Sequence, residues 1–557
     1  MTHSPNPALV THRAAQRLPR LALILFCAAY VLPGLFGRDP WKNADITAFG
    51  YMVNMAQGRS SWLAPTIGGL PSDAALLPYW LGASFVKLLG PWIGTPLAAR
   101  IPFALLLVLV LALIWYSTYY LARTEAAQPL PFAFGGEANP VDYARAIADG
   151  ALLALIASLG LLQLGHETTP ELAQLASVSL YLFGLCAGPF HGGLARLAIV
   201  TALPALAASG GPTVAATLGL VGMLLCRASD HAPVRHLSRW VAASTALAAL
   251  VAWWLGAWGW RLGGYSSMAQ VVASAKLLAW FMWPAWPLAC WTLWRWRQHL
   301  LRRHIAVPLC CTLVSVAACL AMGGSDRALM LALPPLAVLA SFALPTLQRS
   351  TAAAIDWFSV FFFSICALVI WVVYVAMQTG VPPQPAANVV RRVPGFTPSF
   401  SLVALLFALA GTLAWVWLVR WRTGRHRHPL WKSLVLPASG VALSWLLLMT
   451  LWLPVLDYAR SYRPLVERIG RHIPRDACVS TIDVSRGQLV AVEVLGGLRV
   501  DAVTPPSESG CDFLLRLEPR NAPAKPRLQG WTLVARERRP SDADDVTAIY
   551  RRTRQGS

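Results

Sequence analysis

The sequence predicts an α-helical bundle that crosses a membrane many times, followed by a small α/β domain outside the membrane. Of the 557 residues, 56% are hydrophobic and only 13% are charged, whereas a soluble domain carries about 25% charged residues. Apolar runs long enough to cross roughly 30 Å of hydrocarbon recur along most of the chain. From about residue 456 the chain changes character, because Arg, Asp and Pro become frequent.

Apolar segments of the first part are interpreted as thirteen membrane-spanning helices. The segment LLPYWLGASFVKLLG (76–90) is also apolar, but it is short and contains Lys87. We therefore expect an interfacial helix there, lying along the membrane rather than through it. The predicted spans are 21–37, 98–121, 149–165, 172–188, 192–209, 213–226, 240–260, 272–293, 304–322, 328–346, 357–378, 400–419 and 433–454.

The positions of the basic residues predict the orientation of these spans. The formal net charge is +21, but no nucleic-acid-binding motif accompanies it, and Lys and Arg occur in bursts between apolar runs. With thirteen spans, the four most basic segments fall on the cytoplasmic side, as the positive-inside rule requires. Only Arg391 and Arg392 run against the trend. The cytoplasmic segments are HRAAQRLPR, CRASDHAPVRHLSR, WRWRQHLLRRH and RWRTGRHRHPLWK.

This orientation places the N-terminus in the cytoplasm and the C-terminal part in the periplasm of a bacterial inner membrane. An Arg-rich start before an apolar run also resembles a signal peptide, but no small-x-small cleavage site ends the run, so we expect the first span to be retained. The sequence thus predicts a transmembrane domain over 1–455, with a first external loop at 38–97, and a periplasmic α/β domain over 456–557.

The periplasmic domain is expected to contain four or five strands and a helix near 465–473. Its alternating apolar segments are ACVSTIDV, GQLVAVEVLGGLRV, CDFLLRLE, GWTLVARERR and DVTAIYRR, a pattern typical of strands. Eight of the ten cysteines lie in or beside apolar spans, where Cys behaves as a small hydrophobe. Cys478 and Cys511 lie in this domain, and an oxidising periplasm would allow a disulfide between them, although spacing alone does not fix the geometry.

Ionisable residues gather at the outer ends of the predicted spans. Charge is expensive to place near hydrocarbon, so such residues suggest a functional site. A carboxylate can act as a general base towards an acceptor hydroxyl, and a guanidinium can hold a departing phosphate in a bidentate fashion. Sugar transfer from a polyprenyl phosphate would use both groups at the membrane boundary. The candidates are Asp39, Asp45, Asp73, His166, Glu167, Glu171, Asp326 and Arg327.

The chain resembles the GT-C glycosyltransferases of the protein O-mannosyltransferase type, and more closely the bacterial enzyme that transfers aminoarabinose to lipid A. The resemblance covers the first external loop, the helical bundle and the C-terminal external domain. The matching positions are Asp45 before Phe49-Gly50, Gly58, the Trp-x-x-Pro at 62–65, Tyr79-Trp80, His166, Glu171, and Arg327 before LALPP (331–335).

The resemblance implies a role for each matching residue. It implies that Asp45 is the catalytic base, that Arg327 binds the donor phosphate, and that Glu171 and His166 line the substrate site. By their position at the outer face, Asp39 is a second catalytic candidate, and Asp73 and Asp326 are further candidates to line the site. Two departures affect the substrates: the Glu that often follows the first-loop Asp is Ile46 here, and the Lys-Pro-Pro element before Tyr79-Trp80 is absent. The sugar and the acceptor, whether lipid A, another glycan or a protein, stay open.

Each candidate also has a structural explanation. Asp45 could be a helix N-cap, and Asp39 and Asp73 could start turns. Glu171 could complement a helix dipole, and His166 could cap a helix C-terminus. Arg327 could reach towards lipid headgroups, with Asp326 as its ion-pair partner or as an N-cap.

The main functional alternative is a transporter or flippase of lipid-linked envelope precursors. Such proteins are commonly built from repeated halves with broken helices at the midplane, and no convincing repeat is visible here. A non-catalytic scaffold of an envelope assembly is a second alternative. No P-loop, GxGxxG turn or Cys/His zinc set is present, so the sequence points to no particular cofactor. A divalent cation could bind the external carboxylates, although their spacing gives this no support. The expected partners are an undecaprenyl-phosphate type donor, membrane lipids and an external acceptor.

Overall fold

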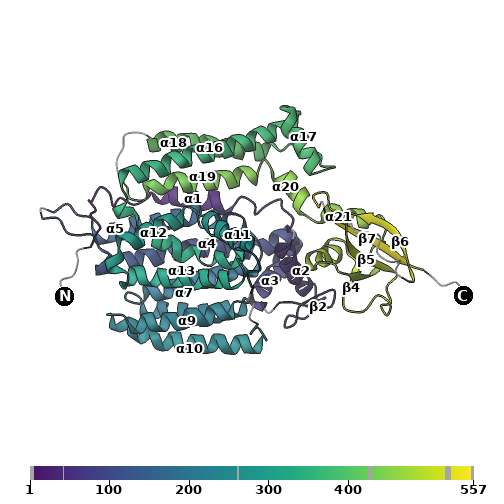
Figure 1. Ribbon diagram of the computed structural model, residues 1–557, viewed down its shortest axis with the longest axis horizontal. Helices are drawn as coiled ribbons and strands as arrows, with labels where there is room; N and C mark the ends of the chain where they lie inside the picture. Colours follow the sequence, from purple (N-terminus) through teal and green to yellow (C-terminus); the bar gives the residue numbers. More distant parts are fainter. Residues whose placement is uncertain are drawn as a thin grey trace.

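The protein consists of a long helical bundle with a small sheet domain at one end (Figure 1). The computed structural model describes residues 6–41, 43–73, 75–133, 135–259, 263–423, 429–520, 529–542 and 544–553. Helices α2 and α3 lie between the bundle and the sheet domain, and the first loop therefore joins the two parts. The predicted fold class, a helical membrane bundle with a C-terminal α/β domain, is confirmed.

The bundle is built from helices of very different lengths. The first loop contributes α2, the strands β1 (Thr66–Ile67) and β2 (Leu70–Pro71), and α3. The helices are α1 (Arg20–Val31), α2 (Ala44–Ala56), α3 (Leu76–Ile93), α4 (Thr95–Ala122), α5 (Pro140–Ala157), α6 (Leu161–Leu164), α7 (Pro170–Ala187), α8 (Gly192–Ala208), α9 (Pro212–Arg227), α10 (Ala232–Trp254), α11 (Met268–Phe281), α12 (Ala285–Arg295), α13 (Arg303–Ala321), α14 (Asp326–Met330), α15 (Leu333–Ser341), α16 (Arg349–Thr379), α17 (Pro383–Arg392), α18 (Leu402–Thr423) and α19 (Lys432–Leu448).

The count of thirteen spans is not confirmed. Within the described ranges, six helical segments are long and apolar enough to cross a membrane, or seven when the bent pair α19 and α20 (Leu453–Arg460) counts as one. Helices such as α1, α8 and α9 are apolar but shorter. Hydropathy detects an apolar run but not the turns that divide it, which is why runs of similar composition end as helices of unequal length.

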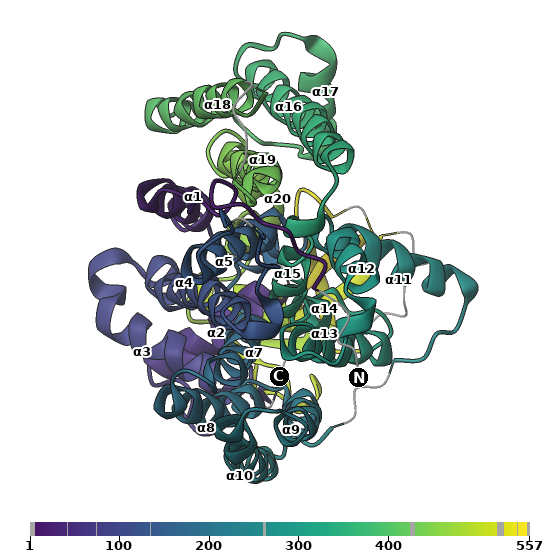
Figure 2. The same cartoon turned by 90° about the vertical axis from the view of Figure 1, so that its left-hand side faces the viewer.

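Several predicted spans are interrupted. The segment 272–293 forms two helices, α11 and α12, that are separated at Pro284, since Pro lacks the N–H that would continue the helix. The segment 433–454 bends by 71° between α19 and α20. The predicted interfacial segment 76–90 is the helix α3, and Figure 2 shows α3 from the side in a view that looks nearly along α9 and α10.

The C-terminal domain contains a mixed five-stranded sheet in the described residues, in the order β4-β3-β5-β7-β6. The parallel part pairs β3 (Cys478–Ile482) with β4 (Arg499–Asp501) and β5 (Phe513–Pro519), and β7 (Asp545–Arg552) pairs antiparallel with β5 and β6 (Trp531–Glu537). The predicted helix near 465–473 is α21 (Arg463–Ile469).

One strand prediction in this domain is wrong. The segment GQLVAVEV forms α22 (Arg486–Val490) and a turn of π-helix over Ala491–Leu495, and only the last two residues of the predicted strand, Arg499 and Val500, contribute to β4. The run is almost continuously apolar because both sides of this helix are covered. Val490 fills the space above Gly50 of α2, where a Cβ would lie 2.4 Å from a Val490 methyl carbon. A buried helical segment and a buried strand have the same apolar pattern.

Hydrogen bonds connect the C-terminal domain to the first loop. The Glu493 carboxylate accepts hydrogen bonds from the Asn54 side chain at 2.9 Å and from the Gly68 N–H at 3.0 Å. The Ala502 N–H donates to the Gly68 carbonyl. Gly68 has a φ of +54°, a conformation that Gly adopts without a Cβ penalty. The predicted disulfide between Cys478 and Cys511 is present and ties β3 to the segment before β5.

Candidate active site

A cavity of about 780 Å³ lies where loops from the end of the bundle meet the first loop. Its lining includes the turn 209–213 between α8 and α9, residues after α10, and the connection between α13 and α14. Residues of the connections SGGP (209–212), HETTPE (166–171) and MGGSDR (322–327) lie together around the cavity. Glu171, Arg327 and Asp73 supply charged groups to its wall.

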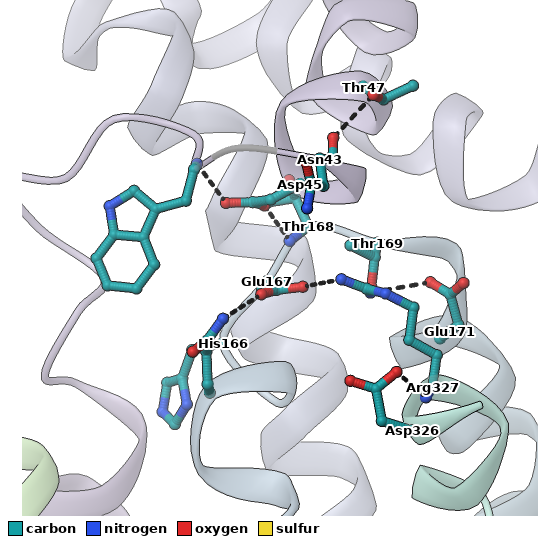
Figure 3. A network of polar contacts seen from close by, with 12 residues as sticks. Asn43, Asp45, Thr47, His166, Glu167, Thr168, Thr169, Glu171, Asp326 and Arg327 are labelled. Carbon is teal, nitrogen blue, oxygen red and sulfur yellow. Dashed lines mark hydrogen bonds and ion pairs between the residues drawn. The ribbon is translucent and has the colours of Figure 1, made fainter. Parts of the chain in front are cut away.

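Arg327 lies between two glutamates at the edge of this cavity (Figure 3). Its Nη2 is 2.6 Å from Oε2 of Glu167, and its Nη1 is 3.4 Å from Oε2 of Glu171. Nη1 also donates to the Thr169 hydroxyl at 3.2 Å. The Arg327 side chain is 23% exposed. The guanidinium is thus oriented by the segment 167–171 while it keeps access to the cavity.

Glu167 is a site residue that the sequence prediction left out of the binding set. Its side chain is only 4% exposed, and the second carboxylate oxygen, Oε1, accepts a hydrogen bond from the Gln163 amide at 2.9 Å. Glu171, in contrast, is 24% exposed and lines the cavity. The two glutamates therefore differ in surroundings: Glu167 is enclosed and paired with Arg327, and Glu171 faces the cavity.

Asp45 is completely enclosed beside this network. Its Oδ1 accepts hydrogen bonds from the backbone N–H and the hydroxyl of Thr168, each at 2.8 Å. Its Oδ2 accepts from the Trp41 N–H at 3.0 Å and lies 3.4 Å from Nη2 of Arg38. The residue at the N-cap position of α2 is Asn43, and these hydrogen bonds of Asp45 lead to Trp41 and to the connection between α6 and α7.

Asp45 and Glu167 have pKa values shifted in opposite directions. Burial alone would raise the pKa of Asp45, but the charges of Arg38 and Arg100 and the N–H donors of Thr168 and Trp41 outweigh it and lower that pKa. Burial, with the nearby Asp45 charge, raises the pKa of Glu167 despite the Arg327 ion pair. Two neighbouring carboxyl groups whose pKa values are shifted in opposite directions are typical of sites that perform acid–base chemistry.

Two buried arginines complete the surroundings of Asp45, and neither was a sequence candidate. Arg38 is 3% exposed and Arg100 is 4% exposed. Arg38 donates to the His166 carbonyl at 2.8 Å, and its guanidinium stacks on the Trp41 ring. Arg100 lies inside the predicted span 98–121, and a charged residue within a span is a signal that could have identified it.

His166 has its imidazole directed away from Arg327 (Figure 3). Nδ1 lies 2.7 Å from the Leu162 carbonyl and Nε2 lies 2.8 Å from the Tyr30 carbonyl, while the ring packs against Trp445. Burial lowers the pKa of His166 to about 4. The structure therefore gives His166 a contact with the first helix rather than with the cavity.

Asp39 lies on the side of the first loop that faces the C-terminal domain. Its carboxylate receives Nε and Nη2 of Arg463 at 2.8 and 2.7 Å and the Ser461 hydroxyl at 2.9 Å. Burial acts to raise its pKa, but the hydrogen bonds and charge of Arg463 outweigh it and lower the pKa. Asp39 thus joins the first loop to the junction between α20 and α21.

The remaining two candidates lie at the margin of the site. Asp73 is 61% exposed, lines the cavity and lies 3.4 Å from Nη1 of Arg486. The Asp326 carboxylate accepts the Arg327 backbone N–H at 2.8 Å. In the part of the chain that is described, no group of three or more His, Cys, Asp or Glu side chains could hold a metal ion. Lys42, in the first loop, lies outside the described residues.

Comparisons with known proteins identify the fold. No protein-family model matches the chain, and no curated protein sequence matches it. Two crystal structures of ArnT from Cupriavidus metallidurans, one bound to undecaprenyl phosphate and one in the apo state, are similar over 95% of this chain. They share 14% and 15% identity with it, each with a TM-score of 0.59, and 96% and 98% of their own chains are covered. The chain therefore has the fold of ArnT, as the sequence resemblance implied.

Proposed function

We propose that this chain is a membrane glycosyltransferase that moves a sugar from a polyprenyl phosphate to an acceptor on the outer side of a bacterial inner membrane. The observation that carries the proposal is the placement of Arg327, half-enclosed by Glu167 and Glu171 at the edge of a 780 Å³ cavity. Of these contacts, the one to Glu171 is long. An incoming phosphate oxygen can therefore replace Glu171 while Glu167 keeps the guanidinium in place.

The apolar side of the cavity suits a lipid-linked donor. Residues of α13, namely Val314, Ala317, Ala318 and Ala321, and of α9, namely Val214, form part of its lining. Small apolar side chains can accommodate a hydrocarbon chain without unpaired polar groups. In the proposed arrangement the prenyl chain enters from the bilayer between helices, and the phosphate meets Arg327. The similar ArnT structure that is bound to undecaprenyl phosphate supports this choice of donor.

The reaction would transfer the anomeric carbon from phosphate oxygen to acceptor oxygen. The acceptor hydroxyl forms the new C–O bond, the bond between the anomeric carbon and the phosphate oxygen breaks, and the electron pair leaves with the phosphate. The hydroxyl proton passes to a carboxylate. We assign the base to Asp45, which would exchange the Thr168 hydroxyl for the acceptor hydroxyl. Glu171 is the alternative because it already faces the cavity.

Sugar transfer by the purified protein in lipid tests the proposal. A panel of undecaprenyl-phosphate sugars would be offered with an envelope extract to the wild type, Asp45→Asn and Glu171→Gln, with Arg391→Met as a control outside the site. Loss of transfer of about 10²-fold or more in Asp45→Asn alone supports Asp45 as base. Transfer that is lost only in Glu171→Gln moves the base to Glu171. No transfer by wild type from any donor overturns the glycosyltransferase and favours a transporter.

A further inference from the structure

A partly buried hydrogen-bond chain leads from the end of α20 to the cavity. Nη1 of Arg460 donates to Oε1 of Gln163 at 2.8 Å, and Nε2 of Gln163 donates to Oε1 of Glu167 at 2.9 Å. The other oxygen of Glu167 receives Arg327 at 2.6 Å. The chain thus joins three separate regions of the sequence, α20, α6 and α14, and it ends on the guanidinium proposed to hold the donor phosphate.

The chemistry of each link fixes the orientation of the next. Arg has only donors, so Arg460 must face the carbonyl oxygen of the Gln163 amide. The amide nitrogen then points to Glu167 and donates to it. Without Arg460 the amide could turn round, and its oxygen would face the Glu167 carboxylate, which has no proton to offer when ionised. Arg460 therefore selects the amide orientation that keeps Glu167 in place.

Arg460 also contacts Trp41, which lies next to Asp45. Its guanidinium lies 4.7 Å from the centre of the Trp41 ring, a distance at which a cation and an indole face attract each other. The Trp41 N–H donates to Asp45, and the Trp41 indole N–H donates to Asp457 on the same helix as Arg460. Arg460, at the junction with the C-terminal domain, therefore contacts both Gln163, whose hydrogen bonds lead to Arg327, and Trp41, whose backbone N–H donates to Asp45.

We infer that Gln163 and Arg460 are positioning residues that act through Glu167 to hold the Arg327 guanidinium at the cavity. The inference rests on the proposed function, because it concerns the group assigned to the donor phosphate. It also gives a role to the end of α20, where the chain enters the C-terminal domain. Residues there position Arg327 through hydrogen bonds and do not contact the substrate themselves. Neither residue lines the cavity.

Steady-state kinetics with varied donor tests this role in Gln163→Leu and Arg460→Met. Because a misdirected Arg327 weakens phosphate binding, the KM for the donor should rise about five- to tenfold in each variant, with kcat changed less. A merely structural defect would instead reduce the amount of active protein, lowering the apparent kcat and leaving KM unchanged. Gln378→Leu is the matched control: it makes the same change in a glutamine near the end of α16, whose amide donates an exposed hydrogen bond to the Ser399 carbonyl.

A double-mutant cycle shows whether Gln163 acts through Glu167. In the wild-type background, Gln163→Leu should raise the KM for the donor about five- to tenfold. In a protein that already carries Glu167→Gln, the same change should raise KM by less than about twofold. Equal effects in both backgrounds, or unchanged KM in an active Gln163→Leu protein, would overturn the inference and leave the proposed function standing. A wild type that transfers sugar from no donor would overturn the proposed function and this inference with it.

Discussion

Thr168 donates both its backbone N–H and its hydroxyl to the same carboxylate oxygen of Asp45, each over 2.8 Å. The pair joins the first turn of α2 to the connection between α6 and α7, residues that are more than a hundred positions apart in the sequence. Because Glu167 precedes Thr168, the contact also fixes the backbone that presents Glu167 to Arg327. Asp45 therefore orders the phosphate side of the site as well as being the proposed base.

Thr168→Val keeps the backbone donor and the shape of the side chain but removes the hydroxyl. A buried carboxylate oxygen then loses one partner, which should lower the free energy of unfolding by about 1–2 kcal/mol. Thermal unfolding in detergent, followed by Trp fluorescence, measures the effect, and Thr168→Ser should restore wild-type behaviour. An unchanged midpoint in Thr168→Val would show that the hydroxyl contact does not stabilise the fold.

Glu167→Gln should change how stability depends on pH. Because the folded-state pKa of Glu167 is raised above its ordinary value of 4.5, the folded protein binds more protons than the unfolded chain between these two values. The stability of the wild type should therefore fall, relative to Glu167→Gln, as the pH rises through this window. Unfolding midpoints of both proteins across pH 4 to 8 measure the difference in slope. Parallel curves would contradict the raised pKa.

Arg463→Met removes the bidentate partner of Asp39 at the domain junction. This half-exposed pair contributes about 1 kcal/mol or less, so the C-terminal domain should detach more often and limited proteolysis near the junction should accelerate by up to about fivefold. Asp39→Asn should behave in the same way, since it removes the same ion pair. If Asp39→Asn abolishes transfer while Arg463→Met does not, Asp39 acts in catalysis rather than in the junction.

The disulfide between Cys478 and Cys511 reports the side of the membrane on which the C-terminal domain lies. We predict that both thiols resist alkylation in intact cells until a reductant is added, because disulfides persist in an oxidising periplasm. Cys511→Ser leaves the partly exposed Cys478 free and provides the positive control. The variant should also destabilise the domain by about 2–5 kcal/mol. Alkylation of both cysteines without a reductant would place the domain on the cytoplasmic side.

The class of fold was accessible from sequence because composition and apolar run length reflect the bilayer directly. The number of spans was not, since the break at Pro284 and the bend between α19 and α20 divide runs that have uniform hydropathy. The helical segment Arg486–Leu495 was taken for a strand for a related reason: its apolar residues are covered on both sides, by α2 and by the sheet domain, and periodicity is lost.

The site was only partly predictable. Arg327 and Glu171 stood out because charges at the ends of spans are costly, and the structure brings them together at one cavity. Gln163 and Arg460 carry no such signal, because their roles arise from contacts between α6 and α20 that depend on the tertiary fold. His166 matched the family pattern, yet its ring packs on the first helix, which only the side-chain direction reveals.

Binding of undecaprenyl phosphate to the purified protein tests the central claim, a lipid-phosphate site at Arg327, most directly. The affinity of the wild type would be compared with that of Arg327→Met, Arg327→Lys and the distant control Arg391→Met, all in the same lipid. We predict that Arg327→Met weakens binding at least about tenfold, that Arg327→Lys retains part of the affinity, and that Arg391→Met binds like wild type. Equal affinity in wild type and a folded Arg327→Met protein would contradict the account.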